Sequence, residues 1–364
     1  MNLESEHAIA ASVKPKPLPQ RLACSLVRIL VMLAIIFVAT YVLIAQPTMR
    51  SKSASIKTVD AGEPREHLDS QHQMPSPEVS NKTGRLREHV LALSETFHPR
   101  DWENPANLDR CADYIAGHFE RAGAAVEFQD VPVEGKRYRN VISRFGVGKE
   151  RKIIVGAHYD ACGEMPGADD NASGVAGLLE LARMIGENPP DTEVELVAYT
   201  LEEPPFFGGP QMGSAIHAKS VAGEKKRITG VIVLEMIGYF SDEPGSQTFP
   251  IPALKAVYPD RGNFITVVSR WDQGDWVGKL KTSMKGATKL PVYSFRGPES
   301  LPGVDFSDHR NYWPHGIQSA MITDTAFFRN KAYHTEDDTA GRLDYDRMGM
   351  VVVAVYEAIH ELAD

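Results

Sequence analysis

The segment from Ile153 to Ile185 limits what this chain can fold into more than any other part of the sequence. It opens with an apolar run that is typical of a buried strand. His158 and Asp160 come where that strand would end, and Asp169 and Asp170 come just before a helix would begin. The helix is indicated by apolar residues at helical spacing: Val175, Leu178, Leu179, Ala182 and Ile185. A buried strand followed by an amphipathic helix is the repeating unit of an α/β sheet.

The alternation of strands and helices continues along most of the chain. Helices are expected at Leu86–Leu93, from Leu108 to an end at Gly123, and last at about Tyr345–Leu362. Strands are expected at residues 125–131, 139–145, 152–157, 193–200, 228–234, 264–268 and 316–323. Strands that alternate with helices predict an α/β sheet covered on both faces. The 364 residues show no internal repeat and no second core.

Charged side chains follow three of these apolar strands: His158, the pair Glu202 and Glu203, and Glu235. A fourth strand leads into a loop that holds His334. Burying several carboxylates together is unfavourable unless cations neutralise them. Two divalent metals that share Asp170 would do so, because a carboxylate offers two oxygens. The Glu pair would then supply one ligand and one base. Taken alone, Asp before a helix is more often an N-cap, so this prediction rests on the full set.

Six motifs, in this order, carry a resemblance to a known family: GAHYD, PGADDNASG, LEEPP, LEMIGY, SDHRNYW and TDTAFFRNKAYHTEDDT. From about residue 85 to residue 364 the chain resembles metallopeptidase family 28. This is the family of co-catalytic zinc aminopeptidases, which also includes glutamate carboxypeptidases and glutaminyl cyclases. The resemblance implies a doubly wound, mixed and mostly parallel sheet with helices on both faces.

The resemblance also implies a role for each site residue. His158 and Glu235 would bind one Zn²⁺, Glu203 and His334 a second, and Asp170 would bridge them. Glu202 would act as general base on a metal-bridging water, and Asp160 would fix the tautomer of His158. The peptide bond between Asp170 and Asn171 would be cis, which is rare outside proline. Zinc in both sites is implied by the family, and manganese or cobalt would also suit these ligands.

Two positions depart from the family pattern. Glu235 stands where well-studied members have Asp, and the segment from Pro204 to Ser214 is longer and more aromatic than usual. We expect that segment to line the substrate pocket.

Other polar and aromatic residues have more ordinary expectations. Asp308 and His309 are as consistent with a structural role as with the pocket, and Tyr333 would position His334. The remaining expectations are loop or capping roles for Asp337 and Asp338, packing for Cys162, and no metal contact for His217 and His360. For Trp271, Trp276 and Trp313 core packing is expected, and an apolar specificity pocket is the alternative.

The N-terminal part of the chain is expected to lie outside the folded domain. Residues 29–45 carry no charge, and Lys14, Lys16, Arg21 and Arg28 precede them. This pattern predicts a short basic cytoplasmic tail (1–28), a transmembrane signal anchor (29–46), a flexible linker (47–82) and a zinc peptidase domain (83–364). That domain would be periplasmic or extracellular. A cleaved signal peptide is the alternative.

The leading functional hypothesis is a membrane-anchored di-zinc aminopeptidase that acts on peptides with a free N-terminus. A glutaminyl-peptide cyclase with one zinc and a catalytically inactive ectodomain are the alternatives. A carboxypeptidase is less well supported, because the sequence shows no obvious basic cluster for a C-terminal carboxylate; Arg296, Arg310 and Arg329 are the candidates left open. The net charge of −9 argues against a nucleic-acid partner. Three cysteines give no disulfide framework.

Overall fold

The computed structural model describes residues 29–34, 38, 41 and 77–363. The chain divides into two units, residues 1–43 and residues 44–364, and the second contains the fold described below. The predicted tail lies outside the described residues, as do most of the predicted anchor and linker. Among the residues that are described, no helix is both long enough and apolar enough to cross a membrane.

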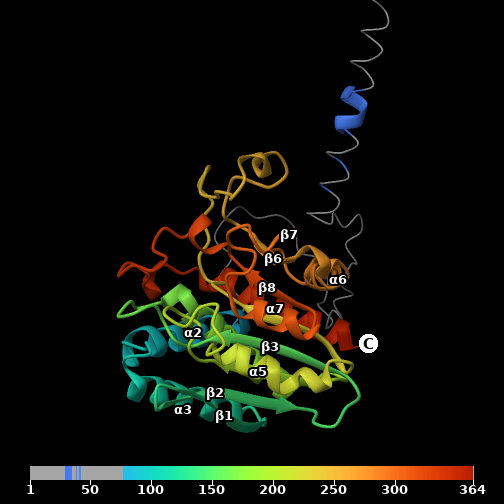
Figure 1. Cartoon of the computed structure of the whole chain (residues 1–364). Coiled ribbons are helices and arrows are strands. Elements are labelled where there is room, and N and C mark those ends of the chain that lie inside the picture. The colour runs from blue at the N-terminus through green and yellow to red at the C-terminus, as the bar shows by residue number, and fades with distance from the viewer. Residues whose placement is uncertain (1–28, 35–37, 39–40, 42–76, 364) are drawn as a thin grey trace, which may run out of the picture. The chain divides into compact units, whose positions relative to one another are not determined.

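One eight-stranded mixed sheet forms the centre of the domain, in the order β1-β2-β4-β3-β5-β8-β6-β7 (Figure 1). Its strands are β1 (Ala125–Val133), β2 (Lys136–Phe145), β3 (Lys152–His158), β4 (Glu193–Tyr199), β5 (Ile228–Leu234), β6 (Ile265–Arg270), β7 (Val292–Gly297) and β8 (Ser319–Thr323). The pairs β1/β2, β2/β4 and β6/β8 are antiparallel. The other four neighbouring pairs are parallel.

The four central strands β4, β3, β5 and β8 are neighbours and run parallel. Their carboxyl ends therefore meet at one edge of the sheet, which is where open α/β folds place their sites. Strands β3, β4 and β5 lead to the predicted site residues His158, Glu202 and Glu235, and β8 leads towards His334.

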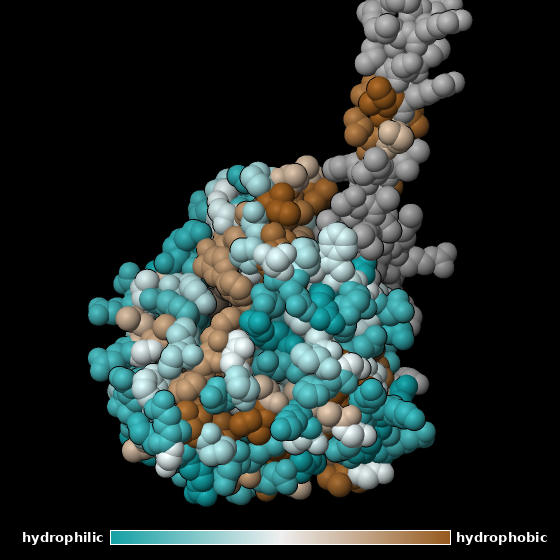
Figure 2. Space-filling model, viewed as in Figure 1, coloured by the Kyte–Doolittle hydropathy of each residue, from teal (hydrophilic) through white to brown (hydrophobic). Residues whose placement is uncertain are grey.

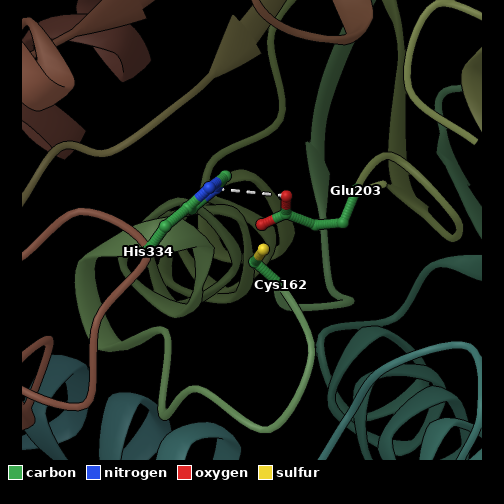
Figure 3. Close-up of side chains that lie close together, drawn as sticks. All are labelled: Cys162, Glu203 and His334. Atoms are coloured by element: carbon green, nitrogen blue, oxygen red, sulfur yellow. Dashed lines mark ion pairs between the residues drawn. The ribbon is translucent and has the colours of Figure 1, made fainter. Parts of the chain in front are cut away.

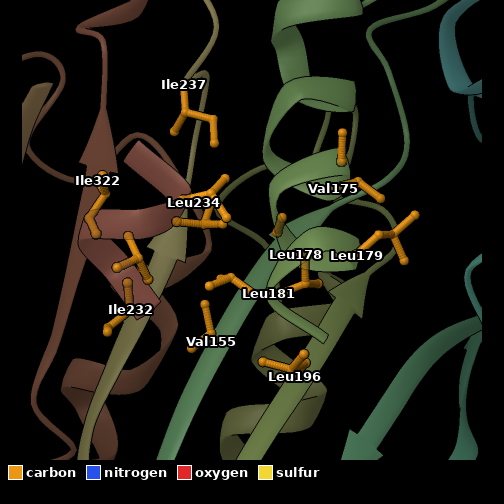
Figure 4. Packing of buried hydrophobic residues seen from close by; sticks show 14 of the residues in the cluster. Val155, Val175, Leu178, Leu179, Leu181, Leu196, Ile232, Leu234, Ile237 and Ile322 are labelled. Carbon is orange, nitrogen blue, oxygen red and sulfur yellow. The ribbon is translucent and has the colours of Figure 1, made fainter. Parts of the chain in front are cut away.

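One face of the sheet is covered by α2 (Pro77–Leu91), α3 (Pro105–Arg121), α4 (Gly174–Glu187), α6 (Gly274–Met284) and α7 (Tyr345–Ala363). Helix α4 lies across the central strands, where Leu178 and Leu181 pack beside Val155, Leu196 and Ile232 (Figure 4). Burying each such side chain is worth about 1.5–3 kcal/mol. This packing fixes the start of α4, and thus Asp170, against the ends of the strands.

The opposite face is covered by α5 (Gly213–Val221) and by a 3₁₀ segment, Asp308–His315. Ala218 and Tyr312 pack there in one apolar cluster with Ile154, Val197 and Val231. Helices on both faces of a mixed, mostly parallel sheet confirm the predicted fold class within the described residues.

Several boundaries differ from the prediction. Helix α2 begins at Pro77, so residues 77–82 of the predicted linker are helical. Its early turns are joined to α7 by a polar contact, Thr83 Oγ1 to Asp346 Oδ1 at 3.0 Å, which a hydrophobic pattern does not reveal. Strand β8 begins at Ser319 and not at Gly316, because Gly316 ends the 3₁₀ segment in the left-handed conformation at φ 69°. The edge strand β7 was not predicted.

Candidate metal centre

The predicted ligands meet around the carboxylate of Asp170. On one side, His158 Nε2 lies 3.4 Å from Asp170 Oδ1 and 3.3 Å from Glu235 Oε2. On the other side, His334 Nε2 lies 3.1 Å from Asp170 Oδ2 and 3.2 Å from Glu203 Oε2. One carboxylate thus stands between two imidazoles, and each of its oxygens faces a different ring.

The backbone takes unusual conformations beside these ligands. Leu201 precedes Glu202 at φ 58°, Met236 follows Glu235 at φ 49°, and His334 itself has φ 56°. Non-glycine residues in the left-handed region are strained and concentrate at functional sites. Leu201 and Met236 redirect the chain just after β4 and β5, and His334 makes a similar turn in the loop that follows β8.

Asp170 is positioned by a second acid that sequence reasoning treated only as a capping residue. The buried carboxylate of Asp338 accepts the backbone N–H of Asp169 at 3.0 Å and that of Asp170 at 3.0 Å. The peptide bond between Asp170 and Asn171 is cis, as the resemblance implies. The side chain of Asn171 donates to Leu234 O at 2.9 Å and accepts from Met236 N at 3.1 Å, which joins the start of α4 to the end of β5.

Asp160 has a different set of contacts from the one predicted. Its carboxylate accepts the backbone N–H groups of Glu202 at 3.2 Å and Glu203 at 3.0 Å. The carboxylate Oδ1 is 3.5 Å from His158 Nδ1, whereas the backbone carbonyl of Asp160 is nearer, at 3.2 Å. Asp160 therefore holds the Glu pair in place as well as standing beside His158. The sequence indicates only the contact with His158, whose role in fixing the tautomer stays a prediction; the contacts with the Glu pair were not predicted.

Glu235 is held by a residue that sequence reasoning missed. Ser307 Oγ donates to Glu235 Oε2 at 2.7 Å, and both side chains are buried. Ser307 opens the SDHRNYW motif, in which the sequence indicates a role only for Asp308 and His309. The loop between β3 and Asp170 is likewise held by a residue outside the motifs: the buried Arg100 donates to the carbonyls of Tyr159 and Pro166.

The ionisation of the centre reflects crowding of buried acids. Burial raises the pKa of Glu202 well above its usual range, and the charges of Glu203 and Glu235 act in the same direction. Burial and the charge of Asp170 raise the pKa of Glu203 to about 7. Burial opposes ionisation of Asp170 too, but hydrogen bonds from His158 and His334 hold its pKa below the usual range. Burying these carboxylates side by side opposes their simultaneous ionisation, and nearby positive charge favours it.

The residues fit bound cations. Glu203 is only 4% exposed, yet its Oε1 has no hydrogen-bond partner among the described residues. Three overlapping groups each bring potential ligand atoms within 4.8 Å of one another: His158 with Asp170 and Glu235, His158 with Glu202 and Glu203, and Cys162 with Glu203 and His334. Imidazole nitrogen, carboxylate oxygen and thiolate sulfur are the ligands that zinc takes in proteins.

A cavity of about 280 Å³ opens from the acids into an apolar chamber. Asp170, Glu202, Glu203 and Glu235 lie at its polar end. Its apolar lining includes Phe207, Phe249, Phe264, Phe295, Phe306, Phe327, Phe328 and Met321. Figure 2 shows hydrophobic surface gathered in a band on one side of the domain, with hydrophilic surface flanking it. Pro204 and Phe207 belong to the longer loop, so its predicted place beside the pocket is confirmed.

The tryptophans do not line the chamber. Trp276 and Trp313 are buried and pack as expected, but Trp271 is 45% exposed, which contradicts its expected place in the core. The phenylalanines come mainly from loops without periodic patterning, so sequence reasoning had no signal for them.

The remaining candidates are mostly structural. His217 contacts the hydroxyl of Tyr312 at 2.7 Å and Glu195 at 3.1 Å, and His360 packs against Tyr356. The imidazole Nε2 of His309 lies 2.9 Å from Val304 O, and the backbone carbonyl of His309 accepts a hydrogen bond from Ser319 Oγ at 2.7 Å. Asp308 is buried, and burial raises its pKa to about 7. The ring of Tyr333 stacks on that of His334 with centroids 3.8 Å apart, in agreement with a positioning role.

Cys162 is the exception among these residues. It was expected to be a packing residue, but it is only partly buried and lies in the loop after β3, close to Glu203 and His334 (Figure 3). Loops carry no hydrophobic pattern, so the sequence could not separate a packing cysteine from one at the site.

An open α/β sheet that brings histidines and carboxylates together at the carboxyl ends of its parallel strands has the architecture of a metal-dependent hydrolase. The model of peptidase family M28 matches residues 140–359. The chain therefore belongs to peptidase family M28, whose members typically use zinc.

Other proteins resemble this chain in sequence or in fold. The uncharacterized protein YfbL of Escherichia coli strain K12 is 47% identical over 301 residues, which are 80% of this chain and 90% of that protein. Two solved structures share the fold. A zinc aminopeptidase from Bacillus subtilis has a TM-score of 0.61 at 16% identity and covers 77% of this chain and 95% of its own. A glutaminyl cyclase from Bacteroides thetaiotaomicron has a TM-score of 0.58 at 20% identity and covers 76% of this chain and 97% of its own.

Proposed function

We propose that this protein is a membrane-anchored aminopeptidase that uses two zinc ions to remove N-terminal residues from peptides. The observation that carries the proposal is the carboxylate of Asp170, whose two oxygens lie 3.4 Å and 3.1 Å from the imidazoles of His158 and His334. A carboxylate shared by two ligand sets is what a two-metal hydrolytic site requires.

The ligand sets divide as the resemblance implies. His158 and Glu235 would hold one zinc, Glu203 and His334 the other, and Asp170 both. When bound, zinc supplies Lewis acidity that polarises a scissile carbonyl and lowers the pKa of water. The chain's own contribution is to fix this geometry: Ser307 orients Glu235, Asp338 holds the backbone of Asp170, and Asp160 holds the backbone of Glu202 and Glu203.

Glu202 is the residue placed to move protons. Its Oε2 lies 3.8 Å from His158 Nε2, whereas the nearest oxygens of Asp170 and Glu235 lie 3.4 Å and 3.3 Å from that nitrogen. Glu202 therefore borders the metal centre but is farther from His158 than the two carboxylates proposed as ligands. As general base, the Glu202 carboxylate would take a proton from the attacking water while the C–O bond forms. It would then give that proton to the amine nitrogen as the C–N bond breaks, and so return to the carboxylate.

The pocket supports action at a peptide N-terminus. Its acidic end would attract the positively charged α-amino group of the substrate. The first side chain of the substrate would then enter the apolar chamber, where burial of apolar surface favours binding.

The test is release of p-nitroaniline from leucine and alanine p-nitroanilides by the full-length chain. Glu202→Gln keeps the size of the side chain but removes the base, and we expect a loss of at least about 100-fold in kcat with two zinc ions still bound. Glu336→Gln is the matched control, because Glu336 is exposed and only two residues from His334. Activity of Glu202→Gln equal to that of the control would refute the assignment of the base.

A glutaminyl-peptide cyclase is the competing enzyme, because a solved cyclase shares the fold. The two functions differ in metal content, near two zinc ions per chain for the peptidase and near one for the cyclase. Cyclisation of an N-terminal glutamine without p-nitroanilide release would favour the cyclase. An inactive ectodomain would bind no zinc, and the full set of ligands argues against it.

We also propose that residues 29–46 anchor the protein in a membrane with its catalytic domain outside the cytoplasm. The support is the uncharged run from Ile29 to Ala45, preceded by four basic residues. Extraction of the protein from membranes by alkaline carbonate would contradict this proposal.

A further inference from the structure

The thiol of Cys162 lies at the half of the metal centre that contains Glu203 and His334. Its Sγ, a carboxylate oxygen of Glu203 and an imidazole nitrogen of His334 are all within 4.8 Å of one another. Figure 3 shows that the three side chains come from different segments and point towards a common space. Among the described residues, the group at the other half of the centre, His158 with Asp170 and Glu235, offers only nitrogen and oxygen.

A second observation indicates that this space takes a ligand. The side chain of Glu203 is buried, with 4% of its surface exposed, and its Oε1 has no hydrogen-bond partner among the described residues. Its other oxygen, Oε2, contacts His334 at 3.2 Å. A buried carboxylate oxygen without a partner is costly. A cation between the thiol, this carboxylate and the imidazole would satisfy it.

The loop that carries Cys162 is held firmly in place. Ala161 N donates to Arg100 O at 3.0 Å, and Met165 N donates to Cys162 O at 3.2 Å. The guanidinium of Arg100 donates in turn to the carbonyls of Tyr159 and Pro166, on either side of the cysteine. The other free cysteine in the described part of the chain, Cys111, is buried in α3. The position of Cys162 is thus set by the loop.

We propose that Cys162 is an additional ligand of the metal held by Glu203, His334 and Asp170. This inference rests on the proposed two-metal function and deepens it. The centre is then asymmetric, with one position bound by nitrogen and oxygen and the other also by a thiolate. The thiol proton is released to solvent when the metal binds. A soft sulfur ligand favours zinc and cadmium over magnesium and manganese at that position.

The first test is the absorption spectrum of the full-length protein loaded with cobalt(II). A thiolate bound to cobalt gives a near-ultraviolet charge-transfer band that imidazole and carboxylate ligands do not give. We expect the band in the wild type and in Cys111→Ala and Cys24→Ser, and its loss in Cys162→Ser and Cys162→Ala. Two bound cobalt ions without the band, or a band that persists in both Cys162 variants, would overturn the inference.

The second test follows the thiol itself. In a Cys24→Ser background, we expect two equivalents of zinc to slow the reaction of Cys162 with a thiol reagent at least tenfold. We expect Cys162→Ser to weaken one of two zinc-binding steps by at least about tenfold. Loss of a residue that only hydrogen-bonds a metal ligand already weakens metal binding by about that factor. An unchanged labelling rate would overturn the inference.

The outcomes separate this inference from the proposed function. A protein that binds two metals and shows the sulfur band, but releases no p-nitroaniline, supports the cysteine ligand and refutes the peptidase. An active two-zinc enzyme without the band refutes only the cysteine ligand. A protein that binds neither metal refutes both.

Discussion

Replacing Ser307 by Ala tests whether the metal centre depends on residues outside the ligand set. Ser307 and Glu235 are 0% and 5% exposed, and the hydroxyl donates to Glu235 Oε2 at 2.7 Å. A hydrogen bond to a charged group contributes about 1.5–3 kcal/mol. Since about 1.4 kcal/mol is tenfold in a binding constant, the metal at His158, Asp170 and Glu235 should bind roughly 10- to 100-fold more weakly in the variant.

The assay is competition for zinc between the metal-free protein and a chromophoric chelator, which resolves two binding steps. Ser307→Ala should weaken one step and leave the other nearly unchanged. Ser269→Ala is the matched control, because Ser269 is also fully buried but donates to a backbone carbonyl, Ser319 O. Unchanged affinity in Ser307→Ala, or equal weakening of both steps, would refute the reasoning that Ser307 acts through Glu235.

Three further predictions address other parts of the structure. Asp160→Asn should lower kcat at least about tenfold, because an amide oxygen cannot replace both acceptors for the two Glu backbone N–H groups; rates above half of wild type would contradict this. In urea unfolding, Gly156→Ala should destabilise the fold by about 1–3 kcal/mol or more, because a Cβ there would lie 2.2 Å from the ring of Tyr199. Gly223→Ala, which has open space, should change little. Burial lowers the pKa of His89 to about 3, so the neutral imidazole contributes fully to stability above pH 6.5. That contribution is lost as the pH falls from 6.5 to about 3, because over this range the unfolded state binds a proton that the folded state does not. Relative to His89→Gln, the wild type should lose on the order of 1 kcal/mol between pH 7 and pH 5.5; parallel pH profiles would contradict this.

The strand ends were predictable because two independent signals coincide there. Buried parallel strands appear as apolar runs, and a charged residue at the end of such a run stands out against them. In the structure, His158 is the last residue of β3, Glu235 directly follows β5, and Glu202 follows β4. Because these strands are parallel neighbours, residues that are far apart in the sequence lie close together at the strand ends. The structure brings the predicted residues together, and their roles as ligands and base stay predictions.

The supporting contacts were not predictable, because they join distant parts of the chain. Ser307 and Glu235 are 72 residues apart, and Asp338 and Asp170 are 168 apart. No local pattern links such pairs. The aromatic chamber has the same difficulty, since residues such as Phe249 and Phe327 lie in segments without periodicity. Their side chains converge only after the sheet has brought the loops together.

The most direct test of the account is the zinc content of the purified full-length protein, measured together with release of p-nitroaniline from leucine p-nitroanilide before and after treatment with a chelator. The account predicts two zinc ions per chain, activity that is lost with the metal, and recovery when zinc is returned. One zinc ion per chain, or activity that survives complete removal of zinc, would contradict it.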